Sequence, residues 1–225
     1  MFARTLFIIK PVSIFLLALC LSACIRQPAT EVAIDPITNP SDLNSLNANK
    51  NKPFIGFPEP SNYSICLHNT CSDIAFVSLS DLQWQNVEAL FYPKSSSAEE
   101  ERLHIKQAIA LLETYTGEQT GTKIDRAENN LSTGKQGQMD CIDEATNSTV
   151  YLRMMDNAGL LSWHTQASRT SRGLFTGQTP HNTATIIETA TEQHFAVDSW
   201  FDANGQWPHI VPLAEWKSGW RPEKN

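Results

Sequence analysis

The sequence predicts an α+β domain in which N-terminal helices pack on a small antiparallel sheet. Apolar residues recur at helical spacing in the first part of the globular region, and serine or aspartate precedes each run where a helix N-cap belongs. After residue 159 the apolar period changes to two, with turn-forming residues between the segments. Helices that precede the strands, instead of alternating with them, are typical of α+β domains.

Three helices are expected. The first begins at Ser80 as S-x-x-Q and the second at Ser97 as S-x-x-E, and both are capping-box patterns. The side chains expected to face the core are Leu82, Val87, Leu90 and Phe91 in the first helix, and Leu103, Ala108, Ile109, Leu112 and Tyr115 in the second. Gly117 is expected to end the second helix. The third spans residues 141–158 and stops at Gly159.

The strands are expected on both sides of these helices. One covers 74–79, and four extended segments follow the helices at 160–166, 183–188, 194–200 and 207–213. The sequence TATE joins 183–188 and 194–200 as a hairpin, and Asn204-Gly205 marks a turn before the last segment. The polar stretch 118–138 lacks apolar periodicity and is expected to be a long loop, either mobile or shaped by a site.

The N-terminus has the layout of a secretory signal, with Arg4 and Lys10 ahead of an apolar run that is too short for a convincing membrane span. Leu21-Ser22-Ala23-Cys24 resembles the bacterial lipoprotein box, which implies removal of residues 1–23 and a lipid on Cys24. Ile25, in place of aspartate, implies the outer membrane, with the domain facing the periplasm. The alternative is an ordinary signal peptide with a coincidental cysteine.

Residues 24–60 are expected to form a lipidated tether, because they are rich in Pro, Asn, Ser and Asp, and 61–225 form the domain. The segment 54–57 is the part of the tether most suited to pack on the domain. Without Arg4 and Lys10 the chain keeps 15 basic and 24 acidic residues, a formal charge of −9. Such a chain is not expected to bind nucleic acid or anionic headgroups through its bulk charge.

An odd number of cysteines remains after removal of the signal and lipidation of Cys24. In an oxidising compartment, Cys66 and Cys71 are close enough in sequence to form a disulfide if the backbone turns. Cys141 is then the thiol left over. Asp140 precedes it directly, and Asp143 and Glu144 follow two and three residues later. Negative charges so close to a thiol disfavour its thiolate form.

The position of Cys141 at the start of the third helix offers another role for those acids. A helix N-terminus favours anions, so Asp140 fits an N-cap and Asp143 and Glu144 fit the first turn. The same field lowers the pKa of a cysteine that has a base nearby. The sequence thus leaves three interpretations of Cys141 open: a catalytic thiol, a buried apolar thiol and a metal ligand.

A thiol nucleophile needs a base, and the candidates are His164, His181, His194 and His209. If the hairpin turns near Ala190, the residue opposite Asp198 is 181, 182 or 183. Cross-strand neighbours lie about 4.5–5.5 Å apart at Cβ, so His181 is within reach of Asp198. His194 is on the same strand as Asp198, about 13 Å away, and is a poorer candidate.

This order of cysteine, histidine and aspartate resembles the transglutaminase-like and papain-like cysteine hydrolases. Asp140-Cys141-x-Asp143-x-Ala145 is similar to the GDCED-x-A signature of the bacterial transglutaminase-like cysteine proteinases. Leu152-Arg153, Gly159-Leu160 and the segment HFAVDSW are similar to the motifs that follow it. The resemblance covers about residues 137–202. It implies a papain-like or transglutaminase-like core, with Cys141 as nucleophile, His181 as general base and Asp198 as its orienting group.

The chain also departs from this family. Ile142 replaces the glutamate that helps the family bind calcium, which leaves Asp140, Asp143 and Glu144 as weak calcium candidates and no other cofactor expected. Asn182 and Thr183 follow His181 where the family has Ala or Met and a hydrophobic residue. An oxyanion donor is also needed, and the candidates are the backbone N–H of Cys141 and the side chain of Gln136 or Gln138.

The expected function is therefore that of an envelope lipoprotein with a thiol hydrolase domain, a peptidase or amidase or an acyl transferase. Its substrate would be a periplasmic protein or a peptidoglycan peptide. The alternatives are a non-catalytic binding or assembly lipoprotein on the same fold and a zinc site of Cys141, His181 and Asp198, which no close ligand spacing favours. Four of the six tryptophans lie in the last 26 residues, either packing the sheet or forming an aromatic platform for a peptide or glycan.

Overall fold

The structure, a computed structural model, describes residues 54–129, 136–173 and 178–223. The expected signal peptide, Cys24 and the tether up to residue 53 lie outside the described residues. Within the described part, no helix is both long enough and apolar enough to cross a bilayer.

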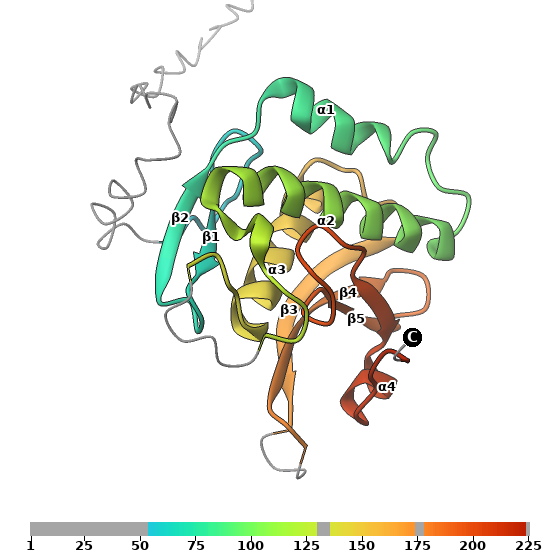
Figure 1. The fold of residues 1–225 in the computed structure, drawn as a ribbon. Helices are drawn as coiled ribbons and strands as arrows, with labels where there is room; N and C mark the ends of the chain where they lie inside the picture. The colour runs from blue at the N-terminus through green and yellow to red at the C-terminus, as the bar shows by residue number, and fades with distance from the viewer. Residues whose placement is uncertain (1–53, 130–135, 174–177, 224–225) are drawn as a thin grey trace, which may run out of the picture. The chain divides into compact units, whose positions relative to one another are not determined.

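The described residues form four α-helices, one 3-10 helix and two antiparallel sheets (Figure 1). The helices are α1 (Asp81–Ala89), α2 (Ala98–Thr120), α3 (Cys141–Asn157) and α4 (Leu213–Lys217), with the 3-10 helix η2 (Thr122–Ile124). The strands are β1 (Tyr63–Leu67), β2 (Asp73–Val77), β3 (His164–Arg172), β4 (His181–Glu188), β5 (His194–Asp198) and β6 (His209–Pro212). β1 pairs with β2, and the larger sheet has the order β3-β4-β5-β6. The predicted mixed α and β class with antiparallel sheets is confirmed.

The predicted helix starts are confirmed by their hydrogen bonds. The Ser80 side chain accepts the N–H of Gln83, and the Gln83 side chain accepts the N–H of Ser80, so the capping box of α1 is complete. Ser97 accepts the N–H of Glu100 at the start of α2. The hairpin around TATE is also confirmed, with Ile187 opposite His194.

The predicted inner faces of α1 and α2 are wrong in two places. Leu82 is 67% exposed, because α1 packs on α2 through a side that carries the fully buried Val87. Leu103 is 46% exposed, because Glu101 takes the inward position instead. The Glu101 carboxylate accepts three consecutive backbone N–H groups, from Ser162 to His164. The inner face of α2 was predicted from the spacing of apolar residues alone. Glu101 departs from that spacing because its buried carboxylate binds backbone N–H groups.

Gly117 does not end α2, which continues to Thr120 and stops at Gly121, where φ is 83°. A Cβ on Gly117 would lie 2.8 Å from the backbone nitrogen of Lys123 and 2.9 Å from Nδ2 of Asn204. The glycine is therefore in the helix because other chain segments approach it closely there.

The strands also differ from the prediction at their ends. β1 was not expected, and it is fully buried against α3. β3 begins at His164 instead of residue 160, since Ser162 and Trp163 donate to Glu101 ahead of it. Residues 54–60 already contact the domain: Phe54 packs on the core, and the Ile55 N–H donates to Ser64.

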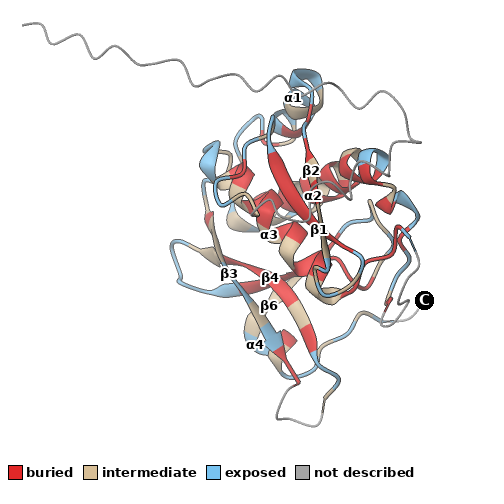
Figure 2. Ribbon diagram, turned by 90° about the vertical axis from the view of Figure 1, so that its left-hand side faces the viewer, coloured by how far each residue is buried: buried red, intermediate tan, exposed pale blue. Residues whose placement is uncertain are grey.

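Helix α3 occupies the centre of the domain. It packs against β1, against β3, β4 and β5, and against α2. Figure 2 shows buried residues along α3 and on the strands next to it, whereas α1 is largely exposed. Leu152 and Met155 are fully buried in this core. The N-terminal end of α3, where Cys141 lies, is thereby held between the two sheets.

Candidate active site

Asp140 caps α3 and so fixes the position of Cys141. Its Oδ1 accepts the N–H groups of Ile142 and Asp143, both at 3.0 Å, and Asp143 accepts the N–H of Asp140 in return, at 3.4 Å. The expected N-cap is confirmed, and it is a capping box in which aspartate takes both positions. Cys141 is the first residue of the helix, and its free thiol is partly exposed.

The same two acids also bind the turn between β1 and β2. Asp140 Oδ2 accepts the N–H of Thr70 at 2.8 Å. Asp143 accepts the N–H groups of Asn69 and Cys71, both at 2.7 Å. Two acids beside the thiol therefore serve the helix start and this turn, which explains their place in the sequence.

The turn itself has an uncommon backbone and contains a disulfide. Four consecutive residues, His68 to Cys71, have φ between 55° and 62°. None of them is glycine, so each is held in a conformation that L-residues rarely adopt. The predicted disulfide between Cys66 and Cys71 is confirmed and closes the turn. The disulfide and the two carboxylates together hold the turn against the start of α3.

These contacts do not fit a calcium site at Asp140, Asp143 and Glu144. All four carboxylate oxygens of Asp140 and Asp143 accept backbone N–H groups. Glu144 instead interacts with Asp125 on another side of the helix. Among the described residues, no three His, Cys, Asp or Glu side chains are arranged to hold a metal ion.

Glu144 belongs to a cluster of three buried carboxyl groups with Asp125 and Glu113. Burial raises the pKa of Glu144 well above its usual value, and the charges of Glu113 and Asp125 raise it further. Burial likewise raises the pKa of Glu113 to about 7, although hydrogen bonds from Gly205 and Ser199 lower it. Burial thus favours the protonated form of Glu144, which donates a hydrogen bond to Asp125.

This cluster supports the chain on both sides of the site. Asp125 Oδ1 accepts the N–H of Met139, two residues before Cys141, at 2.9 Å. Glu113 Oε2 accepts the N–H of Gly205 at 2.9 Å, in the loop that follows Asp198. The cluster therefore connects α2 to the segments that carry the thiol and the aspartate.

His181 and Asp198 are in contact, as the hairpin register predicted. His181 Nε2 donates to Asp198 Oδ2 at 2.7 Å, and both side chains are buried. The register pairs Ala184 with Val197, and its continuation places residue 183 opposite Asp198, within the predicted range. Trp216 of α4, which the sequence did not suggest, also donates its indole N–H to Asp198 Oδ2, at 2.7 Å.

His181 also forms a hydrogen bond with Cys141. Burial lowers the pKa of His181, but the hydrogen bonds to Asp198 and Cys141 and the negative charge of Asp198 raise it more, so the net pKa lies above its usual value. The imidazole is thus held between a carboxylate and a thiol. The arrangement stabilises a protonated imidazole next to the cysteine that begins α3.

The other candidate histidines have different partners. His164 Nδ1 lies 2.9 Å from the buried Glu101, and His209 Nε2 lies 2.8 Å from Asp202. His194 is exposed at the start of β5. Among the described histidines, His181 is the one that contacts Cys141.

Aromatic rings enclose His181. The ring centroids of Trp200, Phe201 and Trp216 lie 4.6, 5.3 and 5.5 Å from that of His181. Trp220 packs in turn on Phe201. Three of the C-terminal tryptophans are therefore used to pack the neighbourhood of the histidine, and this favours the packing explanation of their concentration over an open platform.

The expected glutamines do not contact the thiol. Gln138 is buried and donates its side-chain amide to the carbonyl of Ile124 at 2.8 Å, and Gln136 is exposed. A residue that the sequence did not indicate is closer, since Asn182 Nδ2 lies 3.8 Å from Cys141 Sγ. The alternation of side chains along a strand predicts that residues 181 and 182 face opposite ways, so no sequence signal favoured Asn182.

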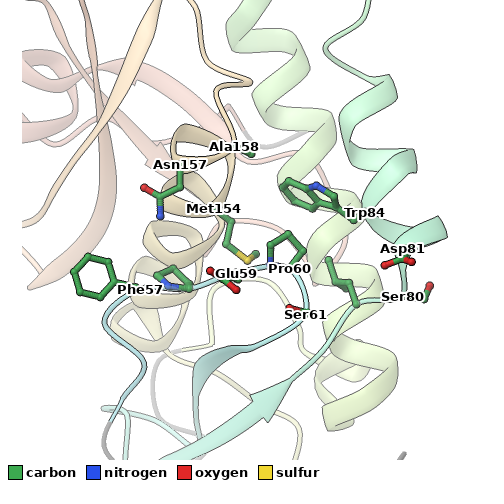
Figure 3. A pocket seen from close by; sticks show the side chains of 12 residues that line it. Phe57, Glu59, Pro60, Ser61, Ser80, Asp81, Trp84, Met154, Asn157 and Ala158 are labelled. Atoms are coloured by element: carbon green, nitrogen blue, oxygen red, sulfur yellow. The ribbon is translucent and has the colours of Figure 1, made fainter. Parts of the chain in front are cut away.

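A groove of about 610 Å³ lies elsewhere on the domain. Figure 3 shows its walls, formed by the segment around Phe57, by Trp84 of α1 and by Met154 near the end of α3. Cys141 and Met154 are 13 residues apart on one helix, or about 20 Å. This groove is therefore separate from the thiol.

The site as a whole brings Cys141, His181 and Asp198 together, with the imidazole of His181 in contact with both of the other side chains. Asp198 binds Nε2 of the imidazole, which leaves Nδ1 as the nitrogen available to the thiol of Cys141. Such an order of contacts, with the imidazole in the middle, suits a nucleophile, a base and an orienting group better than three ligands around one zinc ion. Comparisons of the chain with protein-family models, with curated proteins and with solved structures found no match.

Proposed function

We propose that this chain is a thiol hydrolase of amide bonds, in which Cys141 is the nucleophile, His181 the general base and Asp198 its orienting group. One observation carries the proposal: the imidazole of His181 is held at 2.7 Å by a buried carboxylate and is hydrogen-bonded to the free thiol that begins α3. The resemblance of residues 137–202 to transglutaminase-like and papain-like hydrolases supports it, as does the antiparallel sheet beside the helix.

In the first half of the reaction, the thiol proton of Cys141 moves to the imidazole of His181. The thiolate attacks the carbonyl carbon of the substrate, a C–S bond forms, and the electron pair of the C=O π bond moves to the oxygen. When this adduct collapses, the C–N bond breaks and the leaving amine takes the proton from His181. Asp198 stabilises the imidazolium while it exists.

In the second half, a water molecule attacks the thioester carbonyl as His181 takes one of its protons. The C–S bond then breaks, the carboxylic acid leaves, and the sulfur regains a proton from the imidazolium. If an amine replaces the water, the same steps transfer the acyl group to that amine. Burial of His181 and Asp198 keeps this proton transfer away from bulk solvent.

We further propose that the domain is anchored in a bacterial envelope through a lipid on Cys24. The substrate would then be a periplasmic protein or a peptidoglycan peptide. Metabolic labelling with a palmitate analogue should mark the wild-type chain and leave Cys24→Ala unlabelled. Equal labelling of both chains would contradict the anchor without affecting the proposed chemistry.

The test of the chemistry uses the full-length protein purified in detergent. Release of primary amines is measured from casein and from peptidoglycan stem peptides. The wild type should release them from one of the two substrates, whereas Cys141→Ala should not. The control is Thr149→Ala, a partly buried residue on the same helix, which should retain the activity.

Reactivity of the thiol provides a second measurement that needs no substrate. Cys141 of the folded protein should react with iodoacetamide at pH 7 faster than the same cysteine does after denaturation in urea. Equal amine release by Cys141→Ala and the wild type would exclude the triad. A slow thiol together with no release from either substrate would instead support a non-catalytic binding lipoprotein.

A further inference from the structure

Asn182 has a side chain whose one polar contact, among the described residues, is with the thiol. Its Nδ2 lies 3.8 Å from Cys141 Sγ, and its carboxamide makes no other hydrogen bond to the described part of the chain. The residue is partly exposed, at the start of β4. The packing of the domain therefore does not require an amide at this position.

The backbone N–H of Cys141 is a second donor at the same place. The next three N–H groups of α3 have partners: Ile142 and Asp143 donate to the Asp140 side chain, and Glu144 donates to the Asp140 carbonyl. In the described residues, the N–H of Cys141 has no acceptor. Two donors thus lie beside one nucleophile, one from the start of α3 and one from β4.

We infer that Asn182 is a catalytic residue that donates its side-chain N–H, together with the backbone N–H of Cys141, to the oxyanion formed when Cys141 attacks a carbonyl. This inference rests on the proposed thiol chemistry. The oxyanion is two bonds from the sulfur, and effective donors lie about 3 Å from it. An amide at 3.8 Å from Sγ needs only a small approach to reach that oxygen, and catalytic hydrogen bonds commonly tighten when substrate binds.

The expected alternatives for this role are less suitable. Gln138 already donates to the carbonyl of Ile124 and is buried. Gln136 is exposed and has no contact with the thiol in the described residues. Asn182 thus replaces, from the strand of the histidine, the donor that was expected just upstream of the cysteine.

Two reactions of the same thiol separate an oxyanion donor from a group that merely tunes the thiolate. The burst of p-nitrophenolate from p-nitrophenyl acetate requires attack on a carbonyl: the C–S bond forms, the oxygen takes the π electron pair, and collapse expels p-nitrophenolate. Alkylation by iodoacetamide displaces iodide from carbon and forms no oxyanion. A donor to the oxyanion therefore accelerates the first reaction and leaves the second unchanged.

Both rates are measured on the full-length wild type and on Asn182→Ala, Asn182→Asp and Gln136→Ala. Asn182→Ala should slow the burst by about 100-fold and change alkylation by less than about threefold. Asn182→Asp cannot donate from its carboxylate and should be at least as slow in the burst. Gln136→Ala should match the wild type in both reactions. Thermal unfolding of each variant checks that the fold is intact.

Several outcomes would overturn the inference. An unchanged burst in folded Asn182→Ala would exclude the oxyanion role, and so would an equal loss in both reactions, which would assign the amide to the thiolate. A slow burst in Gln136→Ala alone would return the role to that glutamine. If the wild type gives no burst and its thiol alkylates no faster than in urea, the proposed hydrolase function itself fails.

Discussion

Two groups of buried acids surround the start of α3. Asp143 belongs to one group and its neighbour in the helix, Glu144, belongs to the other. Asp140 and Asp143 face the disulfide turn, and backbone N–H groups of that turn and of the start of α3 bind all four of their oxygens. Glu144 faces Asp125 and Glu113, and its Oε2 has no hydrogen-bond partner among the described residues. One residue along a helix is a rotation of about 100°, which is enough to separate these two environments.

Burial, neighbouring charges and the supply of N–H donors together set the pKa of each acid. Burial and the charge of Asp140 raise the pKa of Asp143 to about 6, while its three N–H bonds lower it, so Asp143 is ionised at neutral pH. The pKa of Glu144 lies well above its usual value for the same first reason, burial, without N–H groups to offset it. Sequence proximity to the thiol therefore says little about the charge that an acid contributes there.

Removal of Asp143 should have the largest effect. In Asp143→Ala the N–H groups of Asn69 and Cys71 lose their acceptor, and the capping box is broken. We expect a loss of roughly 2–4 kcal/mol in the free energy of unfolding, measured by urea denaturation at pH 7. Asp143→Asn, which keeps one acceptor oxygen, should lose less. Equal stability of the wild type and Asp143→Ala would show that the turn does not depend on these bonds.

Asp198 is another buried acid, and it too is supplied with donors, by His181 and Trp216. Asp198→Asn should slow turnover by about 100-fold or more. It should also lower the pKa of His181, because burial then acts without an opposing carboxylate. NMR titration of the imidazole measures this shift. In the wild type, protonated His181 contributes to the free energy of unfolding. This contribution is complete below pH 6.5 and is lost as the pH rises through the higher pKa that His181 has in the folded state.

Loss of the disulfide should have a smaller effect. Cys66 and Cys71 have a sequence separation of 5, and closure of so short a loop accounts for about 2 kcal/mol. The double variant Cys66→Ala/Cys71→Ala should therefore unfold at a lower temperature, with its thiol chemistry retained. Combination with Asp143→Ala should cost less than the sum of the separate losses, because both changes release the same turn. Strict additivity would show that the disulfide and the carboxylates act independently.

Glu144→Gln should have the smallest effect on the free energy of unfolding. Unlike the preceding variants, it should gain stability. The folded-state pKa of Glu144 is raised, so the wild type loses stability as the pH rises above the usual value of 4.5. Glutamine keeps the donor to Asp125 and has no charge to bury. The variant should match the wild type near pH 4 and be more stable by roughly 1–2 kcal/mol at pH 8. A gain of the same size at both pH values would contradict this assignment of the proton.

The sequence predicts most reliably what local chemistry decides. Serine at 80 and 97 and aspartate at 140 begin helices because their side chains satisfy nearby N–H groups, and such bonds depend on three or four residues. The hairpin register likewise depends on one short turn, and from it the contact of His181 with Asp198 follows.

What the sequence does not predict depends on distant partners. Glu101 faces inward because backbone N–H groups some 60 residues away need an acceptor, and Gly117 lies inside a helix because Lys123 and Asn204 approach it. The contact of Trp216 with Asp198 and that of Asn182 with the thiol arise in the same way. The spacing of apolar residues along the chain does not indicate such long-range contacts.

The left-handed backbone from His68 to Cys71 makes the turn an anion receptor whose ligand is part of the same chain. Successive N–H groups in such a conformation line a concavity that suits a carboxylate or a phosphate. Here the aspartates of the α3 start occupy it, delivered at a high effective concentration because they are covalently connected. The start of α3, which carries Cys141, is thus held by intramolecular anion recognition. Unlike a bound effector, this anion is covalently attached to its receptor and cannot diffuse away.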